Sequence, residues 1–390
     1  MIVFFWTCLF LLFYTFIGYG ILLYLMVVIK RVTVKKRKQY YVFDQLPSAT
    51  IIIAAYNEEN IIQQKIENTF GLFYPKEKLS YLIVTDGSSD NTPAIVRNFP
   101  EITLLHSNER KGKINAVHRA MTQTTSEIVI FTDANTFLNK DALTNIARHY
   151  KDINVGAVAG EKRVRIEKNS DATSGEGYYW KYESTLKKWD SELYTVVGAA
   201  GELFSIRSAL YQPVQPDTIL DDFLISMNIA VKGYRIVYEP KAFAVESSSA
   251  NIKEEMKRKV RIAAGGIQSI LRLKKLLNIF RFPVLSFQYI SHRVLRWTIT
   301  PFLMIVVFIL NIYIVINTHI ILYLLLLAAQ IIFYGAAFSG WILDKKEIKN
   351  KFLFIPYYFC FMNFAILLGI KRYFLGNQKA AWDKATRKHN

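Results

Sequence analysis

The chain has 390 residues, of which 52% are hydrophobic, and its formal net charge is +18. This length allows one large domain together with additional segments. Nucleic-acid binding is not expected despite the charge, because the basic residues gather beside apolar stretches and no nucleic-acid recognition motif accompanies them. Such basic flanks suit anionic headgroups, so membrane lipids are the expected partner. The two cysteines, Cys8 and Cys360, lie in apolar stretches, which excludes a disulfide framework or a cysteine-ligated metal site in the central segment.

The chain begins with an apolar segment. Residues 2–29 carry no charge and exceed the roughly 20 residues that a helix needs to cross a bilayer. A cleaved signal peptide is disfavoured, because the segment has no basic start and is too long. The basic cluster at 30–38 follows directly, and the positive-inside rule places it in the cytoplasm. Residues 1–30 are therefore predicted to form a transmembrane helix with its N-terminus outside.

Residues 43–250 form a polar segment in which strand and helix patterns alternate. This alternation predicts βαβ units, an α/β fold with a mostly parallel sheet, and helices on both faces. Ligands of such sheets bind beyond the carboxyl ends of the strands, so we expect the loops that begin at Asn57, Asp86 and Asp133 to lie together. The strand-like runs lie at 49–56, 79–85, 102–106 and 127–132, and helix-like spacing at 58–70 and 113–123.

The C-terminal third returns to apolar sequence. Residues 251–296 mix apolar and basic positions, which predicts amphipathic helices on the cytoplasmic surface, with His292 as an interfacial residue rather than a ligand. Residues 297–370 contain three long uncharged stretches, so four spanning helices are predicted in total. The tail at 371–390 is basic, although three further spans would place it outside. Either the last stretch, interrupted by Pro356, crosses incompletely or the rule is overridden, and full crossing is slightly favoured.

Five short motifs follow one another in the central segment. Each motif is weak alone. The second motif is also explained by an Asx-type turn, and the lysine of the third motif by a solvated surface position. The acidic pair of the fifth motif is also explained by a helix N-terminus, where carboxylates complement the helix dipole. In this order they resemble family 2 of the glycosyltransferases, which are inverting enzymes of the glycosyltransferase-A fold that use nucleotide sugars. The motifs are Ala55-Tyr56-Asn57-Glu58, Asp86-Gly87-Ser88-Ser89-Asp90, Arg110-Lys111-Gly112-Lys113, Asp133-Ala134-Asn135 and Asp221-Asp222.

The nearest resemblance is to membrane-embedded members such as cellulose, hyaluronan, chitin-oligosaccharide and poly-N-acetylglucosamine synthases. It implies a divalent cation, Mg²⁺ or Mn²⁺, held by Asp133. Asn135 replaces the second Asp of the family pattern and would be a ligand without charge. The resemblance also implies that Asp222 is the general base, and a buried Asp221 beside it would raise its proton affinity. The implied nucleotide-sugar-binding residues are Ala55, Tyr56, Asn57, Glu58, Asp86, Lys113, Asp133 and Arg261.

The expected acceptor site departs from the family. Processive relatives carry Gln-x-x-Arg-Trp, whereas this chain has an Arg-x-x-Arg motif in which Arg258 and Ile262 replace the glutamine and the tryptophan. The missing tryptophan puts long-chain processivity in doubt. The small residues Gly198, Ala199 and Ala200 either border the acceptor sugar or serve close core packing, and the sequence does not separate these roles.

Together these features predict a multi-pass enzyme of the inner (plasma) membrane with a cytoplasmic catalytic domain. It would move a sugar from a UDP-sugar to a growing polysaccharide or a membrane-associated glycan and form a β linkage. A transferase that makes a lipid-linked sugar is the main alternative, and a non-catalytic sugar-nucleotide-binding scaffold is a weaker one. A transporter is disfavoured, because intramembrane ionisable residues and repeated helix sets are not evident. The donor sugar, the acceptor and any export or accessory protein stay open.

Overall fold

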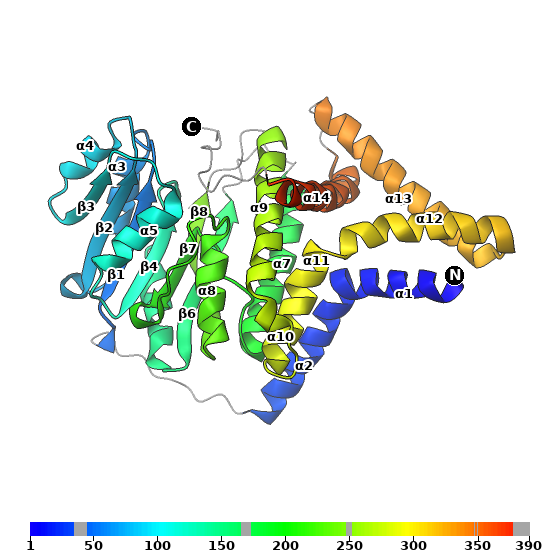
Figure 1. The fold of residues 1–390 in the computed structure, drawn as a ribbon, viewed down its shortest axis with the longest axis horizontal. Helices are drawn as coiled ribbons and strands as arrows, with labels where there is room; N and C mark the ends of the chain where they lie inside the picture. The colour runs from blue at the N-terminus through cyan, green and yellow to red at the C-terminus, as the bar shows by residue number, and fades with distance from the viewer. Residues whose placement is uncertain (35–44, 165–172, 247–251, 347, 349, 377–390) are drawn as a thin grey trace. The chain divides into compact units, whose positions relative to one another are not determined.

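The computed structural model describes residues 1–34, 45–164, 173–246, 252–346, 348 and 350–376. The chain divides into two compact units (Figure 1). The helical unit comprises residues 1–28, 166–186 and 251–377, and the sheet unit comprises 29–165, 187–250 and 378–390. Part of the basic cluster, residues 35–38, and most of the basic tail lie outside the described residues.

The sheet unit contains an eight-stranded sheet in the order β3-β2-β1-β4-β7-β6-β8-β5. The first four strands in this order are parallel, as the alternating pattern predicted. β6 and β8 are also parallel, but β7 runs antiparallel to both β4 and β6, and β5 runs antiparallel to β8. The strands are β1 Ala49–Ala55, β2 Leu79–Asp86, β3 Ile102–Ser107, β4 Ile128–Asp133, β5 Thr136–Leu138, β6 Val155–Val164, β7 Leu203–Arg207 and β8 Arg235–Glu246.

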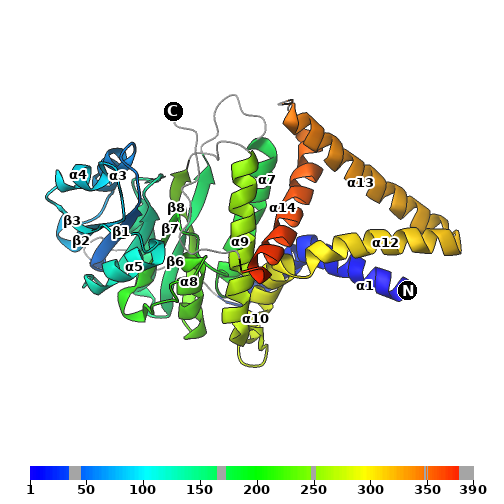
Figure 2. The same cartoon turned by 45° about the horizontal axis from the view of Figure 1, so that its top comes forward.

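The helices of this unit pack on the sheet through short apolar faces. α5 contacts β1 and β2 (Figure 2). It buries Ile114, Val117 and Ala120. β1 is buried along nearly its whole length, as expected for a central strand of a covered parallel sheet. The helices are α3 Ile62–Phe70, α4 Thr92–Arg97, α5 Lys113–Thr122, α6 Ala142–Ala147 and α8 Asp221–Val231. The long helix α7, Thr173–Leu193, passes from the helical unit into the sheet unit.

One predicted helix begins later than expected. The sequence predicted a helix over 58–70, whereas α3 starts at Ile62. The preceding backbone is held by side chains of another loop, because the Glu58 N–H donates to Thr92 Oγ1 at 2.8 Å and the Glu59 N–H to Asp90 Oδ2 at 3.1 Å. Ile61, just before α3, has a φ of −132°, outside the helical range, so the regular helix begins only after it.

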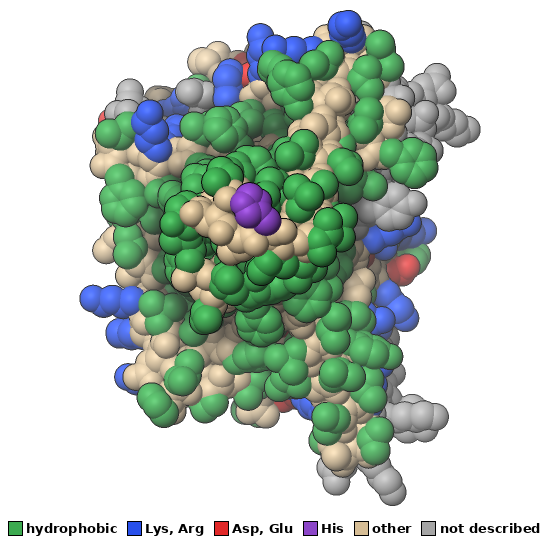
Figure 3. All heavy atoms as spheres, turned by 90° about the vertical axis from the view of Figure 1, so that its right-hand side faces the viewer, with side chains coloured by type: hydrophobic (Ala, Val, Ile, Leu, Met, Phe, Trp, Pro, Cys, Tyr) green, Lys and Arg blue, Asp and Glu red, His purple; other side chains and the backbone are tan. Residues whose placement is uncertain are grey.

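The helical unit contains apolar helices of membrane-spanning length. Within the described residues, four helices are long and apolar enough to cross a membrane, as the sequence predicted. The first combines α1, a π-helical turn and α2, and α12 and α13 pack as a hairpin. Apolar side chains cover this unit's face (Figure 3), and Phe4, Phe10 and Leu325 are among those exposed. The helices are α1 Ile2–Phe13, α2 Tyr19–Thr33, α12 Thr300–Thr318, α13 Ile321–Lys345 and α14 Lys351–Phe374.

The segment predicted to be interfacial forms α9 (Ile252–Arg272), α10 (Pro283–Tyr289), a π-helical turn and α11 (Leu295–Trp297). Its location at a membrane surface stays a prediction, but His292 is not an exposed interfacial residue. It is fully buried, and its Nε2 lies 3.2 Å from Glu183 Oε1 on α7. Arg293 and Arg296 also pair with Glu183, at 2.9 and 3.0 Å. The sequence did not show this cluster, because its carboxylate lies 109 residues before the histidine.

Candidate active site

The loops that follow β1 and β2 interlock at the carboxyl ends of these strands. Asn57 has a positive φ of 53° and donates its backbone N–H to Ser88 Oγ at 3.2 Å. Its side-chain oxygen accepts the Ser89 N–H at 2.8 Å. Ala55 ends β1, and the ring of Tyr56 lies 3.9 Å below the Arg110 guanidinium carbon. Three of the predicted motifs therefore meet in one place.

Asp86 anchors the segment that carries Lys113. It ends β2 and is buried, and its Oδ2 accepts the N–H of Gly112 at 2.6 Å and of Lys111 at 3.1 Å. Gly87, with φ of 68°, permits this approach, since a Cβ there would lie 2.6 Å from Arg110 Cβ. The carboxylate thus fixes the start of α5 at the carboxyl ends of the strands.

Lys113 gathers carboxylates from two distant segments. Its Nζ lies 2.7 Å from Asp133 Oδ1 at the end of β4 and 3.9 Å from Asp221 Oδ2 at the start of α8. Both acidic motifs end or begin an element as the sequence predicted. Gly201 leaves space between Asp222 and Lys113, since a Cβ at this position would lie 3.4 Å from both Asp222 Oδ2 and Lys113 Nζ. A small cavity is lined by Lys113, Asp133, Gly201 and Asp221 among other residues.

The surroundings raise the pKa of both the Asp222 carboxyl group and the Lys113 ammonium group. Burial, and next the negative charge of Asp221, raise the pKa of Asp222 to about 7. Burial alone would lower the pKa of the Lys113 ammonium, but Asp133 and Asp221 outweigh it, so the pKa is raised and the lysine stays charged. A carboxylate that titrates near neutral pH in a charged cavity is suited to general-base chemistry.

Residues 50–213 match the sequence model of the family described as glycosyl transferase family 2. Over these residues the chain is similar to family 2 glycosyltransferases. Two curated relatives are poly-β-1,6-N-acetyl-D-glucosamine synthases. The one from Staphylococcus aureus (strain MSSA476) is 30% identical over 260 residues, which are 63% of this chain and 62% of the relative. The one from Staphylococcus epidermidis is 29% identical over 238 residues, which are 58% and 57%. The match thus spans about three-fifths of the relatives' length.

The fold has a counterpart among solved structures. A mannosyltransferase from Pyrobaculum calidifontis, solved with GDP-Man and Mn²⁺, superposes with a TM-score of 0.70 over 95% of this chain and 99% of its own, at 22% identity. At this identity the likeness concerns the fold alone. It confirms the glycosyltransferase-A type of α/β sheet that the resemblance implied.

In the sheet unit, the turn between β4 and β5 carries the oxygen atoms that would bind a divalent cation. Asp133 supplies a carboxylate and Asn135 an amide oxygen, both suited to hard cations such as Mg²⁺ or Mn²⁺. Among the described residues, no group of three or more His, Cys, Asp or Glu side chains is arranged to hold a metal. The donor set therefore fits a cation that completes its coordination with substrate phosphates and water rather than with protein side chains alone.

The small-residue run of the domain is explained in part by packing. A Cβ on Gly198, which has a φ of 86°, would lie 2.2 Å from the Phe223 ring. The buried Ala199 donates its N–H to Ser226 Oγ at 2.9 Å. Gly198 and Ala199 thus lie against α8, next to the start of that helix. The role of this run in acceptor binding stays a prediction, with Ala200 as its more exposed member.

The remaining predicted residues lie on α9 in the helical unit. Arg258 is partly buried, and its Nη1 lies 4.0 Å from Glu255 Oε2. Arg261 and Ile262 are also partly buried on the same helix. Their parts in diphosphate and acceptor binding stay predictions.

The sequence did not reveal a buried lysine behind the turn that carries Asp133 and Asn135. Lys65 is fully buried on α3, and its Nζ donates to Thr132 Oγ1 at 2.9 Å and to the Thr136 carbonyl at 2.7 Å. The available signal was its position, because Lys65 shares the buried face of α3 with Ile62, Ile66 and Thr69. A lysine at helical spacing among buried positions indicates a buried polar partner.

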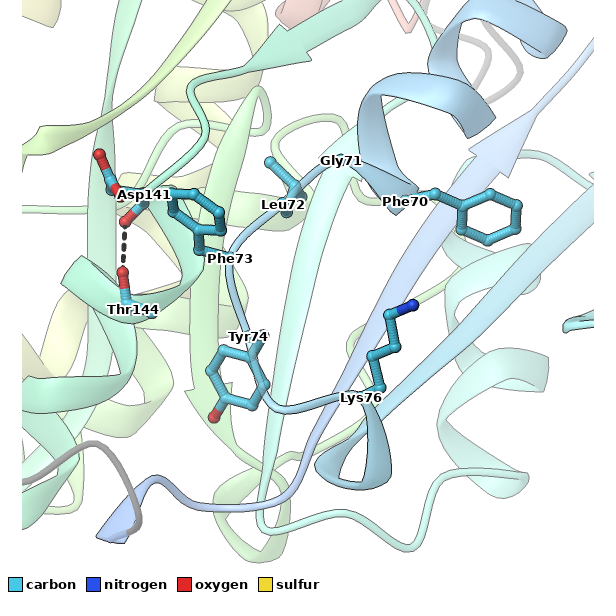
Figure 4. A pocket seen from close by; sticks show the side chains of 8 residues that line it. All are labelled: Phe70, Gly71, Leu72, Phe73, Tyr74, Lys76, Asp141 and Thr144. Carbon is cyan, nitrogen blue, oxygen red and sulfur yellow. Dashed lines mark hydrogen bonds between the residues drawn. The ribbon is translucent and has the colours of Figure 1, made fainter.

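A pocket of about 640 Å³ lies elsewhere on the domain (Figure 4). It is formed by the stretch that follows α3 and by the start of α6, and it includes neither Lys113 nor the acidic residues of the motifs. One face of its Phe73 ring is already covered, since Lys140 Nζ lies 4.2 Å from the ring centroid. The predicted site residues thus line the small cavity at Lys113 and not this larger depression. The lining residues are Phe70, Gly71, Leu72, Phe73, Tyr74, Lys76, Asp141 and Thr144.

Proposed function

We propose that the chain is an inverting glycosyltransferase that moves a sugar from a UDP-sugar to a growing polysaccharide or a membrane-associated glycan, forming a β linkage. One observation carries this proposal above the others. Lys113 and Asp133, which lie within the residues that match glycosyl transferase family 2, converge with the Asp221-Asp222 pair that follows them, and the pKa of Asp222 is raised to about 7.

In the proposed reaction, Asp222 takes the proton of the acceptor hydroxyl while that oxygen attacks the anomeric carbon from the face opposite the diphosphate. The bond between the anomeric carbon and the diphosphate oxygen breaks, and the nucleoside diphosphate leaves with the electron pair. Lys113 places a positive charge at the diphosphate, and Asp133 and Asn135 would hold the cation. The cation, when bound, neutralises charge on the phosphate oxygens. Interlocked loops at Tyr56–Glu58 and Asp86 hold the nucleotide.

The comparisons support the substrate class. Two relatives are named as poly-β-1,6-N-acetyl-D-glucosamine synthases, which favours an N-acetylhexosamine donor and a polysaccharide product. The solved mannosyltransferase binds GDP-Man with Mn²⁺, which favours a divalent cation in this fold. Four apolar helices favour an enzyme of the plasma membrane, and the basic cluster after the first of them favours a cytoplasmic catalytic domain at residues 43–250.

The direct test is to incubate the purified full chain with Mn²⁺ or Mg²⁺ and a panel of UDP-sugars, with GDP-mannose included, and to size the products. Transfer from one UDP-sugar with inversion at the anomeric carbon is the expected result. Absence of transfer from every donor, with folded protein and a range of glycan and lipid acceptors, would contradict the proposal.

Ile262 favours a second candidate, a non-processive transferase that makes short or lipid-linked products. A processive enzyme must hold the chain end between rounds, and an aromatic ring contributes to that hold by stacking and apolar burial. We expect single-sugar or short products from the unmodified chain, and longer ones from Ile262→Trp combined with Arg258→Gln. Gel sizing of labelled product measures this. Long polymer from the unmodified chain would show that another residue supplies the platform.

The raised pKa of Asp222 predicts how the rate depends on pH. A general base works only as the carboxylate, so activity is full above its pKa and falls as the pH drops through it. With a pKa near 7, the rate at saturating donor should decline on acidification from about pH 8 to pH 6, whereas a carboxylate of ordinary pKa would leave it flat. UDP binding measured over the same interval separates loss of the base from loss of the donor. A flat rate profile would argue against Asp222 as the base.

A further inference from the structure

Lys65 lies behind the turn that carries both predicted metal ligands. The turn runs from Asp133 to Asn135, and Lys65 binds the residue on each side of it, Thr132 through its hydroxyl and Thr136 through its carbonyl. Both threonines are buried. The ammonium therefore ties the two ends of the turn to each other and to α3.

The segment before β7 joins the same network. The Thr132 hydroxyl donates to the Glu202 carbonyl at 3.0 Å, and the Glu202 carboxylate accepts from Lys162 Nζ. Glu202 follows Gly201, which lies beside Asp222 and Lys113. The hydrogen-bond network of Lys65 thus connects the Asp133–Asn135 turn to the backbone at Gly201 and Glu202, which lies beside the proposed base Asp222.

Packing alone does not account for a lysine at this position. Within the described parts of the chain, no carboxylate lies within ion-pairing distance of Lys65 Nζ, and the neighbouring buried positions of α3 are apolar except for Thr69. Burial lowers the pKa of Lys65 to about 7, although the negative charge of Asp133 opposes the shift, which reflects the cost of holding a charge there. A methionine would fill similar space without this cost, so the hydrogen bonds to the turn are the feature that requires a lysine.

We propose that Lys65 is a positioning residue for donor binding, which holds the Asp133–Asn135 turn in the shape that a divalent cation and a diphosphate require. This inference rests on the proposed function. Because Asn135 brings no charge, Asp133 is the only anionic ligand on the turn, and affinity then depends more on how well the ligands are pre-positioned. α3 follows the Tyr56–Glu58 loop directly, so Lys65 also links the proposed nucleotide loop to the metal turn.

The test measures binding of Mn²⁺ and UDP to the full chain by isothermal titration calorimetry, beside the thermal midpoint of unfolding. Lys65→Met should weaken UDP binding in Mn²⁺ by about 10- to 100-fold, the usual effect of removing a group that orients metal ligands. The thermal midpoint should fall only slightly, because removal of a buried charge offsets part of the loss of the hydrogen bonds to Thr132 and Thr136. Lys78→Met is the matched control, since Lys78 Nζ also donates to a backbone carbonyl, that of Leu46 at 3.1 Å, before β1 begins.

Lys65→Gln, which keeps a donor but no charge, should give an intermediate affinity. It also decides the case if Lys65→Met does not fold. Wild-type affinity for UDP in Mn²⁺ in the folded Lys65 variants would overturn the positioning role and leave the proposed function standing. An unmodified chain that binds no UDP in Mn²⁺ would instead overturn the proposed function, and the inference with it.

Discussion

Asp222→Asn is expected to lower the rate of sugar transfer by about two to four orders of magnitude and to leave UDP binding intact, as is usual when a general base is removed. The asparagine keeps the size of the side chain, and its amide oxygen can still accept the Phe223 N–H that Asp222 Oδ1 now accepts at 2.8 Å. It cannot take the acceptor proton. Steady-state rates and UDP affinity, measured side by side, separate the two effects.

Asp141→Asn is the matched control for this variant. Asp141 is exposed and lies before α6, on the larger pocket rather than in the cavity at Lys113. Its rate should equal that of the unmodified chain. Near-normal turnover in Asp222→Asn would remove Asp222 from the role of base.

Asp133→Ala is expected to abolish the metal-dependent part of UDP binding, whereas Asn135→Ala should have a milder effect. The reason is charge, because a carboxylate attracts a divalent cation much more strongly than a neutral amide oxygen does. Calorimetry with UDP in Mn²⁺, and again in excess chelator, measures the difference. Asp141→Ala is the control for loss of a carboxylate elsewhere on the domain.

Two results would contradict this expectation. Equal transfer in excess chelator would exclude a metal from the reaction. A larger loss in Asn135→Ala than in Asp133→Ala would show that the amide side, and not the carboxylate, governs cation binding.

Local patterns were sufficient for the elements that carry the chemistry. Asp133 follows five apolar or β-branched residues and ends a strand, and Asp221-Asp222 precede an apolar run and begin a helix. The parallel half of the sheet follows from the same patterns, because apolar runs alternate there with helix-like segments. Parallel strands bring their carboxyl ends together, which placed the loops after β1, β2 and β4 in one region.

Pairings between distant residues were not accessible from the sequence. Lys65 and Thr132 are 67 residues apart, and no local rule connects them. The same holds for Glu183 and His292. The sequence predicted an interfacial histidine, but His292 is buried and pairs with the carboxylate of Glu183 on another helix. The antiparallel insertion of β7 between β4 and β6 is also a long-range choice, since each strand alone suits either direction.

The contact between Lys113 and Asp133 couples the binding of the nucleotide diphosphate, proposed at Lys113, to the binding of the divalent cation, proposed at Asp133. The ammonium and a divalent cation both draw on the carboxylate of Asp133, which Lys113 already approaches to 2.7 Å. A diphosphate that attracts the ammonium leaves this carboxylate freer for the cation. Thermodynamic linkage makes the effect mutual, so nucleotide raises cation affinity by the same factor by which cation raises nucleotide affinity. Without nucleotide, a change in free metal concentration would then alter cation occupancy little, whereas with nucleotide present it would alter the occupancy of both ligands.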